Sequence, residues 1–173
     1  MGVRTIFNVL GPLTNPAGAP NQVLGVFSKE LVKPMAKVLK KLDSNHVMVV
    51  HAKDGLDEIS INRKTWVAEL KNGHIREYKI RPGDFGMKRA SLDAIRADSV
   101  EDSLRIINEV LDNRPGPARD IVCLNAGAAI YTAGVAVSLE QGVALAADSI
   151  ASGKAREKLR QLVELTRSFK QPE

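Results

Sequence analysis

The fold is decided by residues 46–52, His46-Val47-Met48-Val49-Val50-His51-Ala52. This run is rich in β-branched residues and ends at a charged loop that contains glycine, so it predicts a buried strand. A shorter apolar run, Gln22–Phe27, precedes it. The segment between the two runs predicts an amphipathic helix, whose apolar stripe is Leu31, Val32, Met35, Val38, Leu39 and Leu42. Strand, helix and strand at this spacing indicate a βαβ unit with parallel strands and a right-handed crossover.

The loop directly after this strand is Asp54-Gly55-Leu56-Asp57-Glu58. Open α/β sheets bind ligands at the carboxyl ends of their strands. Asp57 and Glu58 could bind one Mg²⁺ there, because this ion prefers oxygen ligands. Neighbouring residues of a regular strand point to opposite faces, so a metal site requires irregular backbone here. The alternative is a solvated acidic turn, since Asp-Gly is a common turn dipeptide.

The rest of the chain divides into a hairpin and a series of helices. Residues 65–70 and 74–80 alternate polar and apolar side chains around Asn72-Gly73, which predicts a β-hairpin. Residues 87–98 indicate a loop with one helical turn. Helices are then expected from Ser99, over residues 118–136, from Ser138 to about Ala151, and over residues 154–168. The buried stripe expected for the first of these helices is Leu104, Ile107, Val110 and Leu111.

Composition bounds the class of protein. The chain has 173 residues, 44% hydrophobic and 26% charged, which fits one globular domain with a substantial core. Its net charge of +5 is too modest to indicate a nucleic-acid partner. Cys123 is the single cysteine, so we expect no internal disulfide and a reducing, cytoplasmic location. No apolar run is long enough to span a membrane.

Several reactive residue types have ordinary explanations. The three histidines, His46, His51 and His74, are scattered, and we expect structural roles for them. Cys123 lies in an apolar helix and is expected to be a buried small hydrophobe. Asn125 is the one polar side chain in the middle of that helix and needs a partner if buried, either backbone or ligand.

The amino-terminal region carries a segment rich in proline and glycine, Gly11–Pro20. The ring of proline fixes φ and glycine permits unusual φ, so this is a shaped loop. A binding loop and a plain connector both fit this pattern. Residues 1–10 place Val3, Ile6, Phe7 and Leu10 on one face of an expected helix.

Three segments together resemble anthranilate phosphoribosyltransferase: Gly2–Pro16, the Asp54–Glu58 loop, and Leu124–Tyr131. The resemblance covers essentially the whole chain but only the carboxyl-terminal half of that family. It implies transfer of a phosphoribosyl group from phosphoribosyl pyrophosphate to anthranilate, with release of pyrophosphate, in tryptophan biosynthesis. It also implies a large α/β domain without the small amino-terminal helical domain of the family.

The expected fold is therefore α/β, with a mixed, mostly parallel sheet, an added hairpin, flanking helices and a helical carboxyl-terminal half. We expect one domain, with a helix and Gly/Pro loop over residues 1–20, the sheet region over 21–98, and helices over 99–173. In the resembled family, Asp57 and Glu58 correspond to a Mg²⁺-binding pair. Gly11 and Pro12 correspond to the loop that lines the anthranilate channel.

The chain also departs from the family. Its Gly-Thr-Gly-Gly-Asp loop, its Lys-His-Gly-Asn segment and an arginine that contacts anthranilate do not occur here. We therefore expect the chain alone to be inactive, and expect its bare apolar surface, notably Val3, Ile6 and Phe7, to favour self-association or a partner. Two other functions stay open. A nucleoside phosphorylase of related fold is one. A non-catalytic nucleic-acid-binding relative is the other, supported only by the net charge and by Lys29, Lys33, Lys37, Lys40 and Lys41.

Overall fold

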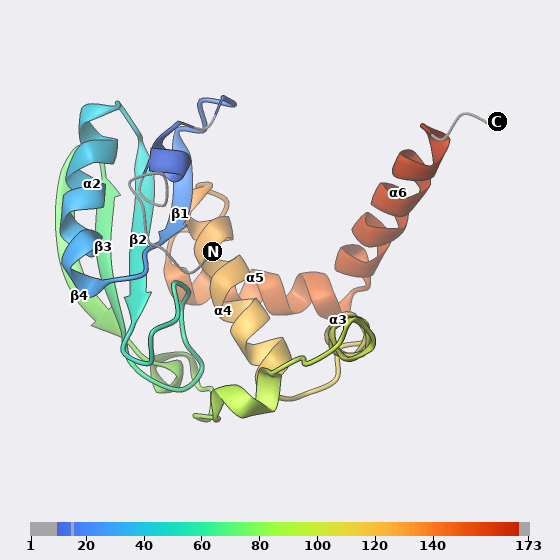
Figure 1. The fold of residues 1–173 in the computed structure, drawn as a ribbon. Coiled ribbons are helices and arrows are strands. Elements are labelled where there is room, and N and C mark those ends of the chain that lie inside the picture. The colour runs from blue at the N-terminus through green and yellow to red at the C-terminus, as the bar shows by residue number, and fades with distance from the viewer. Residues whose placement is uncertain (1–9, 15, 170–173) are drawn as a thin grey trace.

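The computed structural model describes residues 10–14 and 16–169 of the chain (Figure 1). The strands are β1 (Asn21–Gly25), β2 (His46–Ala52), β3 (Thr65–Lys71) and β4 (His74–Ile80). The α-helices are α2 (Val32–Lys41), α3 (Val100–Leu111), α4 (Pro117–Thr132), α5 (Leu139–Ala151) and α6 (Lys154–Ser168). Short 3-10 helices are η1 (Gly11–Leu13), η2 (Lys29–Leu31), η3 (Pro82–Phe85) and η4 (Leu92–Ile95). The helix predicted over residues 1–10 lies outside the described residues except for Leu10.

The four strands form one mixed sheet in the order β1-β2-β3-β4. Strands β1 and β2 are parallel and joined through α2, so the predicted βαβ unit is confirmed. The predicted hairpin is confirmed too, because β3 and β4 pair antiparallel around Asn72 and Gly73, which have φ angles of 51° and 74°. Positive φ at both turn residues is what a tight hairpin requires. The sheet is mixed, as expected, but it is not mostly parallel. The parallel part is the β1–β2 pair alone, because β3 pairs antiparallel with both β2 and β4.

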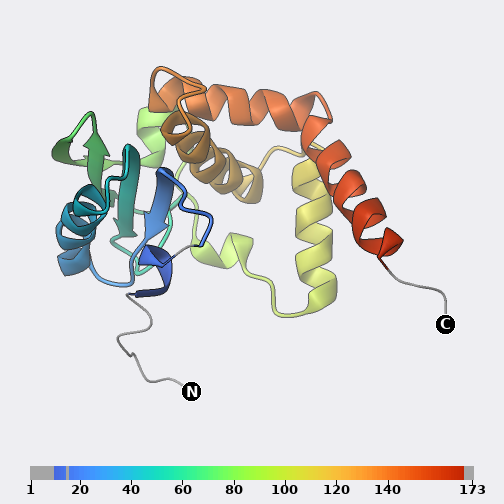
Figure 2. The ribbon, with the colours of Figure 1, turned by 90° about the horizontal axis from the view of Figure 1, so that it is seen from above.

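Strand β2 is the centre of the molecule, and all seven of its residues are buried. Successive side chains of a strand point to opposite faces. Val47 and Val49 accordingly pack with α2, while Met48 and Val50 pack in a second cluster with α4 and α5. Helix α2 thus covers one face of the sheet and the α4–α5 pair covers the other (Figures 1 and 2).

Helices α4 and α5 cross at very short range. A Cβ on Gly127 would lie 2.6 Å from Cα of Val143, and a Cβ on Gly142 would lie 2.3 Å from the carbonyl oxygen of Gly127. Only glycine permits this approach of the two backbones. Helix α4, which is rich in alanine and glycine, thus packs tightly against α5, and the expected burial of Cys123 is confirmed.

Half of the stripe predicted to be buried on α3 is exposed, so that prediction was only partly right. Val110 is buried, but Leu104 is 58% exposed and Ile107 is 46% exposed. Helix α6 extends from the end of α5 away from the sheet (Figure 2) and buries none of its residues. The sequence pattern predicts an amphipathic helix correctly, but it cannot say whether the described chain supplies a partner for the apolar face.

Candidate functional site

The loop that carries Asp57 and Glu58 begins where β2 ends. Residues 53–64 join β2 to β3 without regular secondary structure. The loop starts with a tight turn, in which the Gly55 amide donates to the Ala52 carbonyl (3.0 Å) and the Ala52 amide donates to the Leu56 carbonyl (2.9 Å). The irregular backbone that a two-carboxylate site requires is therefore present at this edge. Figure 1 shows the loop at the arrowhead end of β2.

The loop also lies over the end of β1. Gly25 is the last residue of β1, and a Cβ built on it would lie 1.6 Å from the Asp57 carbonyl oxygen. No side chain fits in that space, so the glycine is what lets the Asp57 backbone approach the strand. Asp57 therefore lies at the carboxyl ends of both parallel strands, which is where open α/β sheets bind ligands.

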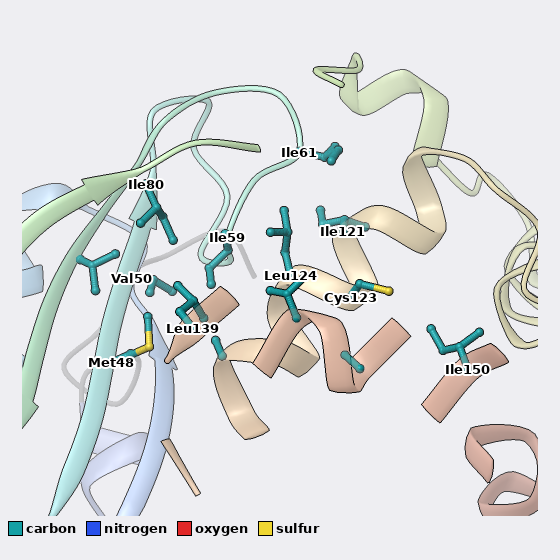
Figure 3. Close-up of a cluster of buried hydrophobic side chains, with 14 of the residues drawn as sticks. Met48, Val50, Ile59, Ile61, Ile80, Ile121, Cys123, Leu124, Leu139 and Ile150 are labelled. Atoms are coloured by element: carbon teal, nitrogen blue, oxygen red, sulfur yellow. The ribbon is translucent and has the colours of Figure 1, made fainter. Parts of the chain in front are cut away.

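A second contact fixes the loop from the other side. Ile59 directly follows Glu58 and is 1% exposed. The Asn125 side chain on α4 accepts a hydrogen bond from the Ile59 amide (2.9 Å) and donates one to the Ile59 carbonyl (3.0 Å). It also donates to the Ile121 carbonyl one turn earlier (3.0 Å). The partner that Asn125 needs is thus loop backbone, and the Ile59 side chain packs towards α4 near Leu124 (Figure 3).

Asp54 holds the interior of the loop. The Ser60 hydroxyl donates to Oδ2 of Asp54 at 2.6 Å, and the same hydroxyl oxygen accepts from the Asn62 amide at 2.9 Å. The other carboxylate oxygen of Asp54, Oδ1, is buried and has no hydrogen-bond partner among the described residues. The loop therefore carries one spare buried acceptor in addition to its two exposed carboxylates.

These residues fit a hard divalent ion bound largely by solvent and substrate. Asp57 and Glu58 are both exposed, so their oxygens are open to a ligand. Within residues 10–14 and 16–169, no three acidic, histidine or cysteine side chains gather as a metal site. Mg²⁺ is commonly held by one or two carboxylates together with water and substrate phosphates, rather than by a cage of protein ligands. Asp57 and Glu58 match that pattern.

Gly11 and Pro12 lie elsewhere. Both belong to η1, which the Thr14 amide closes by donating to the Gly11 carbonyl at 3.2 Å. The next residue, Leu13, lines a hollow with Asp43 and Ser44, which lie in the turn before β2. This is the amino edge of the sheet, whereas Asp57 and Glu58 lie at its carboxyl edge. Within the described residues, the structure does not bring the two predicted pairs together.

The three histidines all have structural partners. Nδ1 of His51 lies 2.8 Å from the Val26 carbonyl, and its ring stacks on Trp66. Nδ1 of His74 lies 2.9 Å from the Asn72 carbonyl. Nε2 of His46 lies 3.0 Å from the Glu69 carboxylate. These contacts agree with the structural roles expected from the sequence.

Glu69 is the centre of a buried polar cluster on the face covered by α4. It is 5% exposed and also accepts a hydrogen bond from the Tyr131 hydroxyl at 2.7 Å. Burial by itself would raise the pKa of Glu69, but hydrogen bonds from Tyr131, His46 and Tyr78 outweigh it and hold the pKa below its usual value. Burial and the Glu69 charge raise the pKa of Tyr78. This cluster ties α4 to the sheet.

Sequence reasoning proposed the acidic pair but missed the contacts that hold its loop. Asn125 gave a usable signal, because it is a lone polar residue in an apolar helix. Gly25 gave none, because a glycine at the end of a strand has many explanations. None of the described helices combines the length and hydropathy that a membrane span requires.

Comparison with known proteins gives consistent results. A family model described as the glycosyl transferase family, a/b domain, matches residues 1–156. The chain is 62% identical over 168 residues to an anthranilate phosphoribosyltransferase of Thioalkalivibrio sulfidiphilus, covering 97% of this chain and 50% of the relative. It is 61% identical to the enzyme of that name from Laribacter hongkongensis, covering 96% of this chain and 48% of the relative.

Solved structures agree with the sequence relatives. The crystal structure of anthranilate phosphoribosyltransferase from Thermus thermophilus matches with a TM-score of 0.87 and 43% identity, covering 96% of this chain and 49% of that one. The Saccharomyces cerevisiae enzyme in complex with PRPP and Mg matches with a TM-score of 0.85 and 29% identity, covering 97% of this chain and 49% of that one. The chain spans about half the length of the relatives it matches. Because the family model covers most of its residues, the chain belongs to the glycosyl transferase family with this a/b domain.

Proposed function

We propose that this chain supplies the Mg²⁺-binding edge of an enzyme that transfers a phosphoribosyl group from phosphoribosyl pyrophosphate to anthranilate in tryptophan biosynthesis. One observation carries the proposal: Asp57 and Glu58 are exposed on an irregular loop at the carboxyl ends of two parallel strands. The names of the relatives and the yeast structure with PRPP and Mg support it.

The role of the chain in this reaction is to place two carboxylates. Gly25 lets the backbone of Asp57 approach β1, and Asn125 fixes the residue after Glu58, so both carboxylates extend from a backbone held on each side. A bound Mg²⁺ would stabilise the negative charge that develops on the departing pyrophosphate. We further propose that Gly11 and Pro12 line the anthranilate site, a role that rests on the resemblance of their segment to the family.

Metal binding is tested with Mn²⁺ as a spectroscopic substitute for Mg²⁺. Purified chain is titrated with Mn²⁺ and free ion is followed by electron paramagnetic resonance, with and without pyrophosphate. We expect pyrophosphate to strengthen Mn²⁺ binding, because phosphate oxygens complete the coordination that two carboxylates begin. Glu58→Gln and Asp57→Asn should each weaken binding by about tenfold or more.

The matched control is Glu101→Gln, which removes an exposed carboxylate from α3, far along the chain from the loop. It should bind Mn²⁺ like the unmodified chain. Equal affinities for Glu58→Gln, Asp57→Asn and the control would show that the ion is not held at this loop.

The transfer reaction needs a separate assay. The 173 residues contain neither the Gly-Thr-Gly-Gly-Asp nor the Lys-His-Gly-Asn stretch of the resembled family. We therefore expect no phosphoribosyl anthranilate from the purified chain with both substrates and Mg²⁺, measured by loss of anthranilate fluorescence. Measurable turnover would contradict the idea that this chain supplies only part of the enzyme.

The uncovered apolar faces of α3 and α6 support association with more protein. Leu104 on α3 and Leu162 on α6 are 58% and 56% exposed. Apolar faces of this kind mark interaction surfaces. We expect concentration-dependent self-association in sedimentation equilibrium, reduced by Leu104→Lys with Leu162→Lys and unchanged by the exposed-site control Lys158→Gln. A monomer at every concentration would rule out self-association through these faces.

A further inference from the structure

Beside the Asp57–Glu58 loop lies a strongly basic hollow that the proposed transfer does not use. It measures about 190 Å³. Seven residues line it, of which five are cationic and the other two are an asparagine and a proline. They are Lys53, Asn62, Arg63, Lys64, Arg81, Pro82 and Arg89. Among the described residues, no carboxylate lines it. We call these seven residues the basic hollow.

The cations come from separate parts of the chain that the fold brings together. Lys53 follows β2, Arg63 and Lys64 precede β3, Arg81 follows β4, and Arg89 lies beyond η3. In the antiparallel sheet, the end of β2, the start of β3 and the end of β4 share one edge. The hollow is therefore at the same edge as Asp57 and Glu58, but neither of these residues lines it.

Hydrogen bonds hold these segments in place. The Lys53 amide donates to the Lys64 carbonyl at 2.9 Å, which joins the two sides of the loop. Nε of Arg89 donates to the Asn62 carbonyl at 2.6 Å, and this bond leaves the terminal nitrogens of the guanidinium for another acceptor. Pro82 is fully buried and forms a rigid part of the wall.

The cationic side chains of the basic hollow have no carboxylate partner among the described residues; the nearest recorded carboxylate contact is that of Asp84, which accepts from the Arg81 backbone amide at 2.8 Å. Among the residues that the structure describes, none of its five cations forms an ion pair with a carboxylate. Most of the other described arginines do form one, namely Arg76, Arg96, Arg105, Arg114, Arg156 and Arg160.

Lys64 responds to both burial and these neighbouring cations. It is half-buried, and desolvation followed by the charges of Lys79, Lys53 and Arg81 lowers the pKa of its ammonium. Like charges held together disfavour the charged form unless an anion relieves them.

We propose that the basic hollow is a binding site for a small phosphate-bearing anion, either free phosphate or a phosphomonoester. Three arginines converge there, and the planar guanidinium matches the oxygens of a phosphate group through paired hydrogen bonds. Lys53 and Lys64 add compact positive charge to the lining. An anion held there would neutralise cations that the described protein leaves unpaired.

The test is a titration of the purified chain with inorganic phosphate, followed by the backbone amide chemical shifts of Lys53, Arg63 and Lys64. A chelator excludes divalent ions, so that an ion bound by Asp57 and Glu58 cannot contribute. Sodium chloride keeps ionic strength constant, because general screening would otherwise imitate weak binding. We expect saturable shifts confined to the residues of the basic hollow.

Variants decide whether the hollow itself binds the anion. Arg63→Gln and Lys53→Gln remove exposed charges without touching the buried wall, and each should weaken phosphate binding by about tenfold, the loss expected for one charge-assisted hydrogen bond. The control Arg114→Gln removes an exposed arginine that is paired with Glu109, and it should bind phosphate normally. A parallel titration with ribose 5-phosphate distinguishes the two kinds of ligand. Tighter binding of ribose 5-phosphate than of inorganic phosphate identifies a phosphomonoester site, and weaker binding identifies a site for the free ion.

Three results would overturn the proposal: shifts that chloride reproduces at equal ionic strength, unchanged binding by Arg63→Gln and Lys53→Gln, or binding of a single-stranded oligonucleotide without binding of either small phosphate. Because the chelated titration involves no metal, its failure would leave the Mg²⁺ proposal intact. Failure of the Mn²⁺ titration would likewise leave the basic hollow intact.

Discussion

Removing the Asn125 side chain should destabilise the loop that carries the acidic pair. The Asn125 amide makes three hydrogen bonds of 2.9–3.0 Å, and two of them satisfy both polar backbone groups of Ile59. Ile59 is 1% exposed, so water reaches its backbone poorly once the amide is gone. In Asn125→Ala the Ile59 amide and carbonyl are therefore left buried without their partner.

The size of the effect follows from those two groups. A buried polar group left unsatisfied costs about 1–3 kcal/mol, and alanine recovers a few tenths of a kcal/mol through its higher helix propensity. For two such groups we therefore expect Asn125→Ala to lower the free energy of unfolding by about 2–5 kcal/mol. For a chain of this length that corresponds to a fall in Tm of roughly 4–20 °C.

The assay combines urea unfolding, followed by circular dichroism, with hydrogen exchange of the segment 54–62. Exchange at the Ile59 amide should accelerate in Asn125→Ala more than exchange in the hairpin, because the lost bonds are local to the loop. The matched control is Asn45→Ala, which removes an exposed amide whose one side-chain contact, to Asn21, is long at 3.4 Å. The reasoning fails if the two variants unfold within about 0.5 kcal/mol of each other and Ile59 exchanges at the unmodified rate.

Two further outcomes are expected. Gly25→Ala places a Cβ 1.6 Å from the Asp57 carbonyl oxygen and should lower the free energy of unfolding, measured in urea, by about 3 kcal/mol. The control Gly83→Ala has no atom within 4 Å of its added Cβ and should change that free energy by less than about 0.5 kcal/mol. Similar values for the two variants would contradict the close approach of Asp57 to β1. Because the pKa of Glu69 is lowered in the folded protein, its carboxylate stabilises the fold above about pH 4.5 and that contribution is lost as pH falls through the folded pKa. Glu69→Gln should thus lower the free energy of unfolding by about 1–3 kcal/mol at pH 7 and by progressively less below pH 4.5. The control is Glu140→Gln, which removes an exposed carboxylate. An effect of Glu69→Gln that does not vary with pH would be inconsistent with a charged, hydrogen-bonded Glu69.

The elements of this fold could be predicted from local patterns. The apolar run His46–Ala52 is a strand because its length and β-branched residues suit no other element so well. The dipeptide Asn72-Gly73 specifies the hairpin turn because its two φ angles must be positive. Ser99 begins α3 by accepting a hydrogen bond from the Asp102 amide, as its position before an apolar repeat indicates.

Other features could not be predicted because they depend on what lies opposite in space. The stripe of Leu104 and Ile107 has a helical period whether or not another element covers it, and here the described chain leaves it exposed. Ser28 precedes η2, but its hydroxyl donates to the Glu30 carboxylate at 2.5 Å and caps no backbone amide. A side chain with two nearby partners gives no sign in the sequence of which one it takes.

The sequence by itself determined where the strands and helices form, and it placed Asp57 and Glu58 directly after the central strand, because periodicity and turn chemistry act over a few residues. Only the tertiary structure decided how that loop is held, since Gly25 and Asn125 reach it from 32 and 68 residues away along the chain, measured from Asp57. It also decided that five cations without an ion-pair partner among the described residues share one edge with the acidic pair. Contacts between residues so distant in sequence arise from packing of whole elements, and no local pattern of residues records them.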